Sequence, residues 1–223
     1  MKHYLTALLA LLAVMCSGII APAYAAEEAR TAPVKSERAP KAETTKASRP
    51  AGEALGKEMF DRSAPSEKAN TDILLPLTGT WVYMATVWAP GAEPQKADGT
   101  ITNQMALGNR FLSTKATGSL NIVDHYVPFE GEGLLGFDKA KKSFTSVWAD
   151  SLTTSMAAGS GKFDAEKRTL SLNGKFTHPL TGAESSFRSE IRLVDAQHYT
   201  QTIFAADKSG KEAKLMEFEY TRN

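Results

Sequence analysis

The chain has 223 residues and is almost electrically neutral, with 26 lysines and arginines against 25 aspartates and glutamates. Binding to a phosphate backbone needs a basic surface, so a nucleic acid is not an expected partner. The chain has a single cysteine, which excludes intramolecular disulfides and multi-cysteine metal sites.

The first 25 residues have the pattern of a cleavable export signal. Lys2 precedes an apolar run over residues 5–14, and small residues then lead to Ala23-Tyr24-Ala25. The run is too short and too weakly flanked for a membrane-spanning helix. Export predicts a periplasmic or secreted protein with no transmembrane segment in the mature chain, and cleavage would remove Cys16. Lipidation of Cys16 is the alternative, but the preceding residues 13–15 fit the lipidation pattern poorly.

Residues 26–70 are predicted to form a tether. Up to residue 50 they are rich in alanine, proline, lysine, glutamate, serine and threonine, with Val34 as the only large apolar residue. Such a composition buries too little apolar surface to offset the entropy of ordering, so we expect a disordered linker. A tail that touches the cell wall or membrane is the other interpretation, but charges of alternating sign favour a solvated linker. A short helix over residues 54–62 would place Leu55 and Met59 on one face.

Residues 71–223 have the repeating pattern of an all-β domain. Segments of about seven to ten residues, rich in threonine, valine and aromatic residues, alternate with glycine, asparagine, aspartate or Lys-Lys breaks. Short links predict antiparallel neighbours, and an up-and-down order that closes on itself leaves no exposed sheet edge. We therefore expect a single antiparallel up-and-down β-barrel of about ten strands. The expected strands cover residues 79–88, 99–107, 110–118, 120–126, 131–137, 143–150, 154–163, 169–176, 185–194, 198–206 and 213–222.

The stretch LTGTW, residues 77–81, opens the first expected strand. A Gly-x-Trp at this place resembles the calycins, the superfamily of lipocalins and fatty-acid-binding proteins, in which the tryptophan closes the barrel floor under a basic residue from near the chain end. The resemblance implies Trp81 and Arg222 as the closing pair, since Arg222 alternates onto the same strand face as Tyr220. A guanidinium over the indole would contribute about 0.5 to 2 kcal/mol. An ordinary core tryptophan with an arginine at a frayed end is the alternative.

Seven motifs taken together resemble one bacterial family. In chain order within residues 74–223 they are LTGTW, LGNRFL, FEGEGLLGFD, SVWADSLTTSM, GKFD, HPLTG and KLMEFEYTR. This set resembles the bacterial family of domains of unknown function number 1579. The resemblance implies a calycin-like barrel and brings no established activity, substrate or catalytic residue. The sequence departs from the family pattern at Asn109, where a second glycine is usual, and at His178, where aspartate is usual.

The run GEGLLG, residues 131–136, matches the letters of the dinucleotide-binding motif G-x-G-x-x-G. That motif binds a pyrophosphate where its glycines open a helix within a βαβ unit. Here the run continues into LLGFD, a strand and its turn, so we expect no nucleotide site. The glycines are expected to let the strand bend or to let another segment approach its backbone closely.

The candidate ligand site follows from strand alternation. In FTSVWAD, the residues Phe144, Ser146, Trp148 and Asp150 alternate onto one face. If that face is inward, two aromatic rings with a hydroxyl and a carboxylate form the kind of lining that small-molecule cavities have. We therefore expect a small apolar or amphipathic ligand in the barrel lumen. The expected lining residues are Tyr83, Phe111, Phe144, Trp148 and Asp150.

Two other functions would use the same barrel. In an enzyme, Asp150 would serve as the acid or base, with its pKa raised by burial. In a filled barrel, side chains would occupy the lumen, and an outer face or the tether would bind a partner; barrels of this strand number exist in both forms. The pair Arg188 and Glu190 is expected to point outward and to form a salt bridge, because buried charges need partners.

No motif points to a catalytic triad, a metal or a cofactor. Ser160, in GSG, lacks the G-x-S-x-G frame of a serine hydrolase. His125, His178 and His198 lie far apart, without the spacing of metal ligands. A haem needs only one histidine, so His198 or His125 stays a minor candidate for haem binding.

Overall fold

The computed structural model describes residues 49–88, 93–122, 125–177, 182–206 and 211–223. These residues belong to two compact units, one that ends at Ser63 and one that runs from Ala64 to Asn223. The predicted export signal, and the predicted tether up to residue 48, lie outside the described residues. None of the described helices has the length and apolar character needed to cross a membrane.

The first unit is described through helix α2 (Arg49–Ser63). This helix is longer at both ends than the one expected within the tether. Lys57 forms an ion pair with Asp61 one turn later, at 2.6 Å, as helix spacing allows. Leu55 and Met59 are both exposed, so the apolar face expected on this helix consists of solvent-accessible side chains.

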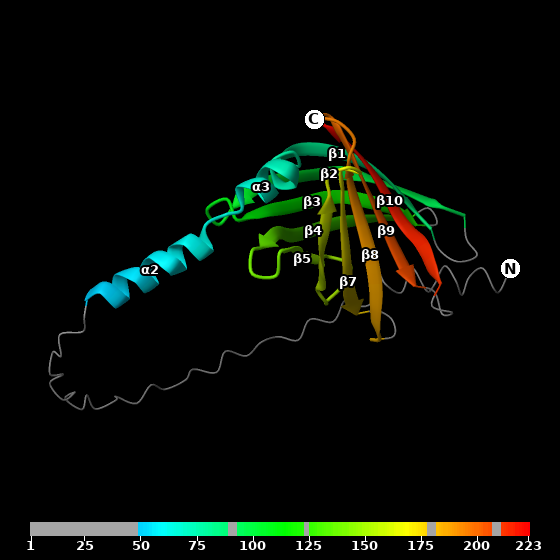
Figure 1. Ribbon diagram of the computed structural model, residues 1–223. Coiled ribbons are helices and arrows are strands. Elements are labelled where there is room, and N and C mark those ends of the chain that lie inside the picture. Colours follow the sequence, from blue (N-terminus) through cyan, green and yellow to red (C-terminus); the bar gives the residue numbers. More distant parts are fainter. Residues whose placement is uncertain (1–48, 89–92, 123–124, 178–181, 207–210) are drawn as a thin grey trace, which may run out of the picture. The chain divides into compact units, whose positions relative to one another are not determined.

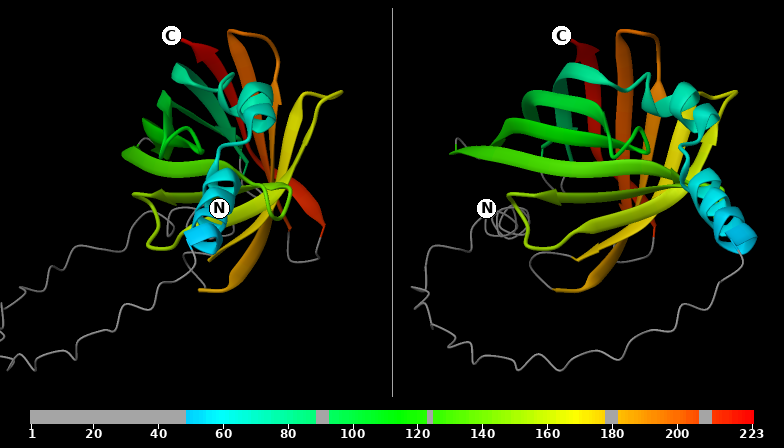
Figure 2. Two further views of the ribbon diagram at one scale, coloured as in Figure 1. Left: turned by 60° about the vertical axis from the view of Figure 1, so that its left-hand side comes forward. Right: turned by 90° about the vertical axis from the view of Figure 1, so that its left-hand side faces the viewer.

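The second unit contains a closed antiparallel barrel of ten strands (Figures 1 and 2). Each strand pairs with its neighbours in sequence, and β10 pairs with β1 to close the sheet. The predicted all-β, up-and-down barrel is therefore confirmed. The strands are β1 (Gly79–Val87), β2 (Gln95–Ala106), β3 (Phe111–Ile122), β4 (His125–Asp138), β5 (Ser143–Asp150), β6 (Ala157–Asp164), β7 (Thr169–Thr177), β8 (Glu184–Leu193), β9 (His198–Ala206) and β10 (Glu212–Arg222).

The two ends of the barrel differ. We call the end where β1 begins and β10 finishes the floor end, and the opposite end the rim end. Two short helices, α3 (Glu67–Ala69) and η1 (Asn70–Leu74), lead into β1. Ile73 and Leu74 are fully buried in the same core as Trp81. The only helix predicted from the sequence covers residues 54–62, so α3 and η1 were not anticipated.

Two glycines that sequence analysis took as strand ends lie inside strands. Gly99 in β2 and Gly118 in β3 are directly paired. A Cβ on Gly99 would lie 2.5 Å from the Tyr83 hydroxyl, and a Cβ on Gly118 would lie 2.2 Å from it. The tyrosine therefore requires two residues without side chains where it crosses these strands. The strand expected over residues 120–126 is divided between β3 and β4.

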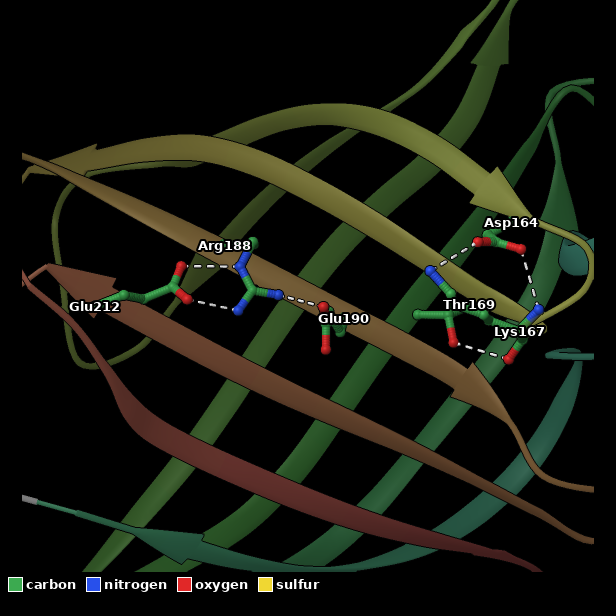
Figure 3. A network of polar contacts seen from close by, with 6 residues as sticks. All are labelled: Asp164, Lys167, Thr169, Arg188, Glu190 and Glu212. Carbon is green, nitrogen blue, oxygen red and sulfur yellow. Dashed lines mark hydrogen bonds and ion pairs between the residues drawn. The ribbon is translucent and has the colours of Figure 1, made fainter.

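Charged side chains on the outer wall pair with one another (Figure 3). Arg188 donates from Nε and Nη2 to the two carboxylate oxygens of Glu212, at 2.8 and 2.6 Å, and from Nη1 to Glu190. The guanidinium carbon also lies 4.0 Å from the centre of the Phe204 ring. Arg188 and Glu190 flank the buried Ser189 in β8, so they point outward. The predicted outward salt bridge is confirmed.

Candidate functional site

The inner face of the barrel is packed near the floor end and partly exposed towards the rim end of β4 to β9. Strand alternation assigns residues to the two faces, with the buried side chains inward. The packed set includes Trp81, Leu112, Leu170, Leu172 and Tyr199, each at most 4% exposed. The inward side chains that remain partly exposed near the rim end include Phe129, Trp148, Phe176, Phe187 and Ile203. Phe137 and Phe163, at the floor-end tips of β4 and β6, are also only partly buried. Solvent thus reaches an aromatic inner surface near the rim end.

Trp81 fills the floor end of the barrel. Its side chain is 1% exposed, and its indole N–H donates to the Leu77 carbonyl oxygen at 2.9 Å. The Asn103 side-chain amide donates to the same oxygen, also at 2.9 Å. The Tyr199 ring meets the indole edge-on, with ring centroids 4.7 Å apart. The indole is therefore held both by a hydrogen bond and by close packing.

Arg222 covers Trp81 from the last strand. The two residues are partners in the β1–β10 register, and the guanidinium carbon lies 4.0 Å from the centre of the indole. The guanidinium also donates to three backbone carbonyls, at 2.7 Å to Thr78, 3.1 Å to Pro76 and 2.9 Å to Ala196. These contacts tie the segment before β1, the β8–β9 turn and β10 together at the floor end.

Three buried tyrosines lie next to Trp81 and its neighbours. Tyr199 and Tyr220 stack with centroids 4.1 Å apart, and Tyr83 lies 5.8 Å from Tyr220. Burial raises the pKa of Tyr83 to about 12, with a smaller contribution from the negative charge of Asp98. Burial also raises the pKa of Tyr199 and of Tyr220. Tyr83, expected as a lining residue, faces inward but belongs to this packed layer.

Trp148 and Asp150 lie together on the inner face near the rim end. The Trp148 indole N–H donates to Asp150 Oδ2 at 3.1 Å, and the Leu152 backbone N–H donates to Oδ1 at 3.0 Å. Phe129 is nearly parallel to the indole, with an interplanar angle of 16° and ring centroids 6.4 Å apart. All three side chains are partly buried. We call Phe129, Trp148 and Asp150 the rim cluster.

Glycines of β4 allow the Trp148 ring to lie against the barrel wall. A Cβ on Gly131 would lie 2.3 Å from the indole, and a Cβ on Gly133 would lie 2.8 Å from it. Both glycines belong to the run GEGLLG, which lies inside β4 and leads into β5 rather than into a helix. The glycines therefore serve close packing and lack the helix that a dinucleotide site needs.

Replacing Gly131 by alanine tests this packing. The new methyl group would force the indole from the wall and away from Asp150, so we expect a loss of about 1 to 3 kcal/mol in the free energy of unfolding. In a Trp148→Ala background the same replacement should cost less than about 0.5 kcal/mol, because the methyl group then fills vacated space. Urea unfolding of the four proteins of this cycle measures both costs. Equal costs in the two backgrounds would contradict the contact.

The match to a family model decides the family. A model described as "Protein of unknown function (DUF1579)" matches residues 66–222. The chain belongs to the DUF1579 family. The resemblance seen in the seven motifs is thereby confirmed, and the matched residues contain all ten strands of the barrel.

Solved structures of similar fold accompany the DUF1579 match. Rv2717c from M. tuberculosis is 14% identical with a TM-score of 0.53, over 72% of this chain and 99% of that chain. The S-type phycobiliprotein lyase CPES from Guillardia theta is 9% identical with a TM-score of 0.47, over 74% and 97% of the two chains. A de novo designed fluorescence-activating β-barrel is 12% identical with a TM-score of 0.38, over 68% and 98%. No curated protein matches the sequence.

Two further residues expected to line the lumen of the DUF1579 barrel lie apart from the rim cluster. Phe144 is inward, but it is 4% exposed and so belongs to the packed core. Phe111 precedes the buried Leu112 in β3, and alternation therefore places it on the outer face. Its ring occupies the space next to Gly136, where a Cβ would lie 2.4 Å away. Phe111 was expected to line the lumen, and it lies on the outer face instead.

Phe129, the third member of the rim cluster, was not among the residues predicted from the sequence. The expected strand began at Gly131, which left Phe129 in a supposed loop, whereas β4 starts at His125. The alternation of Phe129, Gly131 and Gly133 would have placed all three on one face.

Of the two histidines considered for haem, His198 is the one whose side chain the structure describes, and it lies at the floor end. His198 begins β9 on the face opposite to the buried Tyr199, and its Nδ1 lies 2.9 Å from Asp195 Oδ1. His178 lies outside the described residues, and for His125 only the backbone is described. Across the described ranges, no group of three or more histidine, cysteine, aspartate or glutamate side chains is arranged to hold a metal ion.

An open depression of about 420 Å³ lies on the outer wall of the DUF1579 barrel. Asp164 lines it and accepts the backbone N–H groups of Glu166 and Lys167, while its second oxygen lies 3.4 Å from Lys167 Nζ (Figure 3). The Thr169 hydroxyl donates to the Lys167 carbonyl at 3.0 Å. These polar groups therefore stabilise the β6–β7 turn, and we assign no ligand to the depression.

Proposed function

We propose that this protein is exported and binds a small apolar or amphipathic molecule on the inner face of its barrel, near the rim end. The contrast between the two ends supports the proposal. At the floor end Trp81 is buried between Arg222 and Tyr199, whereas the inner side chains of β4 to β9 near the rim end are partly exposed.

One observation carries the proposal. The rings of Trp148 and Phe187 both lie against glycines of neighbouring strands, where a Cβ on Gly131 would come within 2.3 Å of the indole and a Cβ on Gly174 within 2.6 Å of the Phe187 ring. Large side chains that lie along the wall leave their faces towards the interior. Partly exposed aromatic faces on a concave surface are the usual lining of a small-molecule site.

The composition of this surface favours an apolar or amphipathic ligand. Phe176 and Phe187 contact each other with ring centroids 6.4 Å apart, and Ile203 lies on the same inner face. Contact with a ligand would remove these apolar atoms from water, and this burial favours binding by about 25 cal/mol for each Å² of apolar surface. The few polar groups near them, above all Asp150, would orient one end of the ligand.

Native mass spectrometry on the mature protein, purified without denaturant, tests the binding function. We expect the protein to carry a ligand that adds to its mass. If the purified protein carries no ligand, we expect it to bind added decanol, as measured by calorimetry. Trp148→Ala should weaken binding by about tenfold or more, because it removes the largest apolar face of the site. Trp88→Ala is the matched control, since Trp88 follows the inward, buried Val87 and its ring lies 5.1 Å from Lys214 Nζ. No bound mass and no decanol uptake, or equal effects of the two variants, would contradict the function.

Export has its own test. Cleavage after Ala25 predicts a periplasmic or secreted protein whose intact mass begins at Ala26. Retention of residues 1–25 would contradict export by this signal. A lipid-modified N-terminal Cys16 would instead support the lipoprotein alternative.

A further inference from the structure

The inner face of the barrel has one acidic side chain in the part of the chain that the structure describes. Strand alternation places Asp150 on this face near the rim end and Arg222 at the floor end. Arg222 is occupied by Trp81 and three backbone carbonyls. The other inward positions whose side chains the structure describes have apolar residues, glycine, or neutral polar residues such as Ser146 and Gln201. The partly exposed region therefore carries a local negative charge.

The Asp150 carboxylate is fixed in position by neutral partners. It accepts hydrogen bonds from the Trp148 indole N–H at 3.1 Å and from the Leu152 backbone N–H at 3.0 Å, one to each oxygen. Each carboxylate oxygen has two lone pairs, so each keeps the capacity to accept one more hydrogen bond. Neither partner neutralises the charge. The carboxylate is thus oriented and able to accept further hydrogen bonds, without a cationic partner among these contacts.

The aromatic members of the rim cluster favour the same kind of group. Phe129 and Trp148 are nearly parallel, at 16°, and the negative face of an aromatic ring attracts a cation within about 6 Å of its centre. A carboxylate beside two aromatic faces is complementary to a protonated amine. The same carboxylate disfavours an anionic head group, because like charges in a partly desolvated site repel each other.

We propose that the ligand of the rim cluster is an amine with an apolar body, whose protonated nitrogen donates a hydrogen bond to Asp150 and lies beside Trp148 and Phe129. This inference rests on the proposed binding function and names the chemical class of its ligand. The charge-assisted hydrogen bond to Asp150 distinguishes the amine from a neutral or acidic molecule with the same body.

Calorimetry with decylamine, decanol and decanoate tests the inference, since the three probes share one alkyl chain and differ in head-group charge at neutral pH. With the mature wild-type protein, we expect decylamine to bind about tenfold more tightly than decanol, and decanoate to bind most weakly. Asp150→Asn keeps the shape of the side chain and should abolish the preference, so that decylamine binds no more tightly than decanol. Glu130→Gln is the matched control, because Glu130 lies next to Gly131, the β4 partner of Asp150, on the outer face.

The possible outcomes separate the two proposals. Binding of decanol as tight as that of decylamine by the wild-type protein would overturn the amine assignment and leave the binding function standing. The same holds if Asp150→Asn and Glu130→Gln change the preference equally. Failure of all three probes to bind would overturn the binding function and the amine assignment with it. The wild-type comparison decides the matter even if Asp150→Asn does not fold.

Discussion

Replacement of Trp81 by alanine should lower the free energy of unfolding by about 3 to 5 kcal/mol. The indole is 1% exposed, and its removal would leave a cavity beneath Arg222 and beside Tyr199. The guanidinium would lose its aromatic partner, and the core would lose a large apolar group. Urea denaturation followed by circular dichroism measures the loss.

Two variants make this result specific to the floor. Trp88→Ala removes the same side chain from the outer wall, where the residue is partly exposed, and should cost less than about 1 kcal/mol. Trp81→Phe keeps part of the apolar volume but loses the hydrogen bond to Leu77, so its cost should lie between the other two. A cost for Trp81→Ala below about 1 kcal/mol would rule out a closing role for this residue.

Alkaline pH should destabilise the barrel strongly. The unfolded chain ionises its tyrosines near pH 10, whereas burial holds the pKa of Tyr83 at about 12 and raises those of Tyr199 and Tyr220 above 10. Each folded tyrosine therefore keeps a proton that the unfolded chain has lost, and the free energy of unfolding falls as pH rises from 10 towards 12. Each tyrosine lowers the free energy of unfolding by about 1.4 kcal/mol per pH unit in that window. The three together lower it by about 4 kcal/mol per pH unit.

Unfolding free energies measured from pH 8 to 11.5 check this prediction. Below pH 10 the three hydroxyls are protonated in both states, so they contribute no pH dependence there. Tyr83→Phe should reduce the slope above pH 10 by about a third, because one of the three ionisations is removed. A free energy of unfolding that stays constant between pH 10 and 11.5 would show that the folded state does not hold these protons.

The barrel could be predicted from the sequence because period-two alternation and short links are local signals. The strand boundaries were predicted less accurately than the fold, and the errors at these boundaries share one cause. Gly99, Gly118 and Gly131 were placed at strand ends, but each lies within a strand beside an aromatic ring. A glycine required by the packing of a distant side chain is identical in sequence to a glycine required by a turn, so local pattern alone does not separate the two.

The candidate site shows the same division between local and distant information. The alternation of Trp148 and Asp150 within one strand places them on one face, and the structure has a hydrogen bond between them. Whether an inward residue is packed or accessible depends on neighbours from other strands, and this is where Tyr83 and Phe144 differ from Trp148. Phe111 lies next to the buried Leu112, and because successive side chains in a strand point to opposite faces, it is outward.

The contact of Arg222 with the Thr78 carbonyl joins residues 144 positions apart. During synthesis, β1 leaves the ribosome long before its partner β10 exists, so the nascent chain has no means of closing the sheet until its final strand emerges. Nine of the ten strand pairs join neighbours in sequence, but the β1–β10 pair closes a loop that spans the whole barrel. The entropy of that loop is lost before the contacts that stabilise the closed barrel are made. Closure of the barrel is therefore expected only after synthesis of β10 is complete, whereas the hairpins between neighbouring strands need no residue beyond their own.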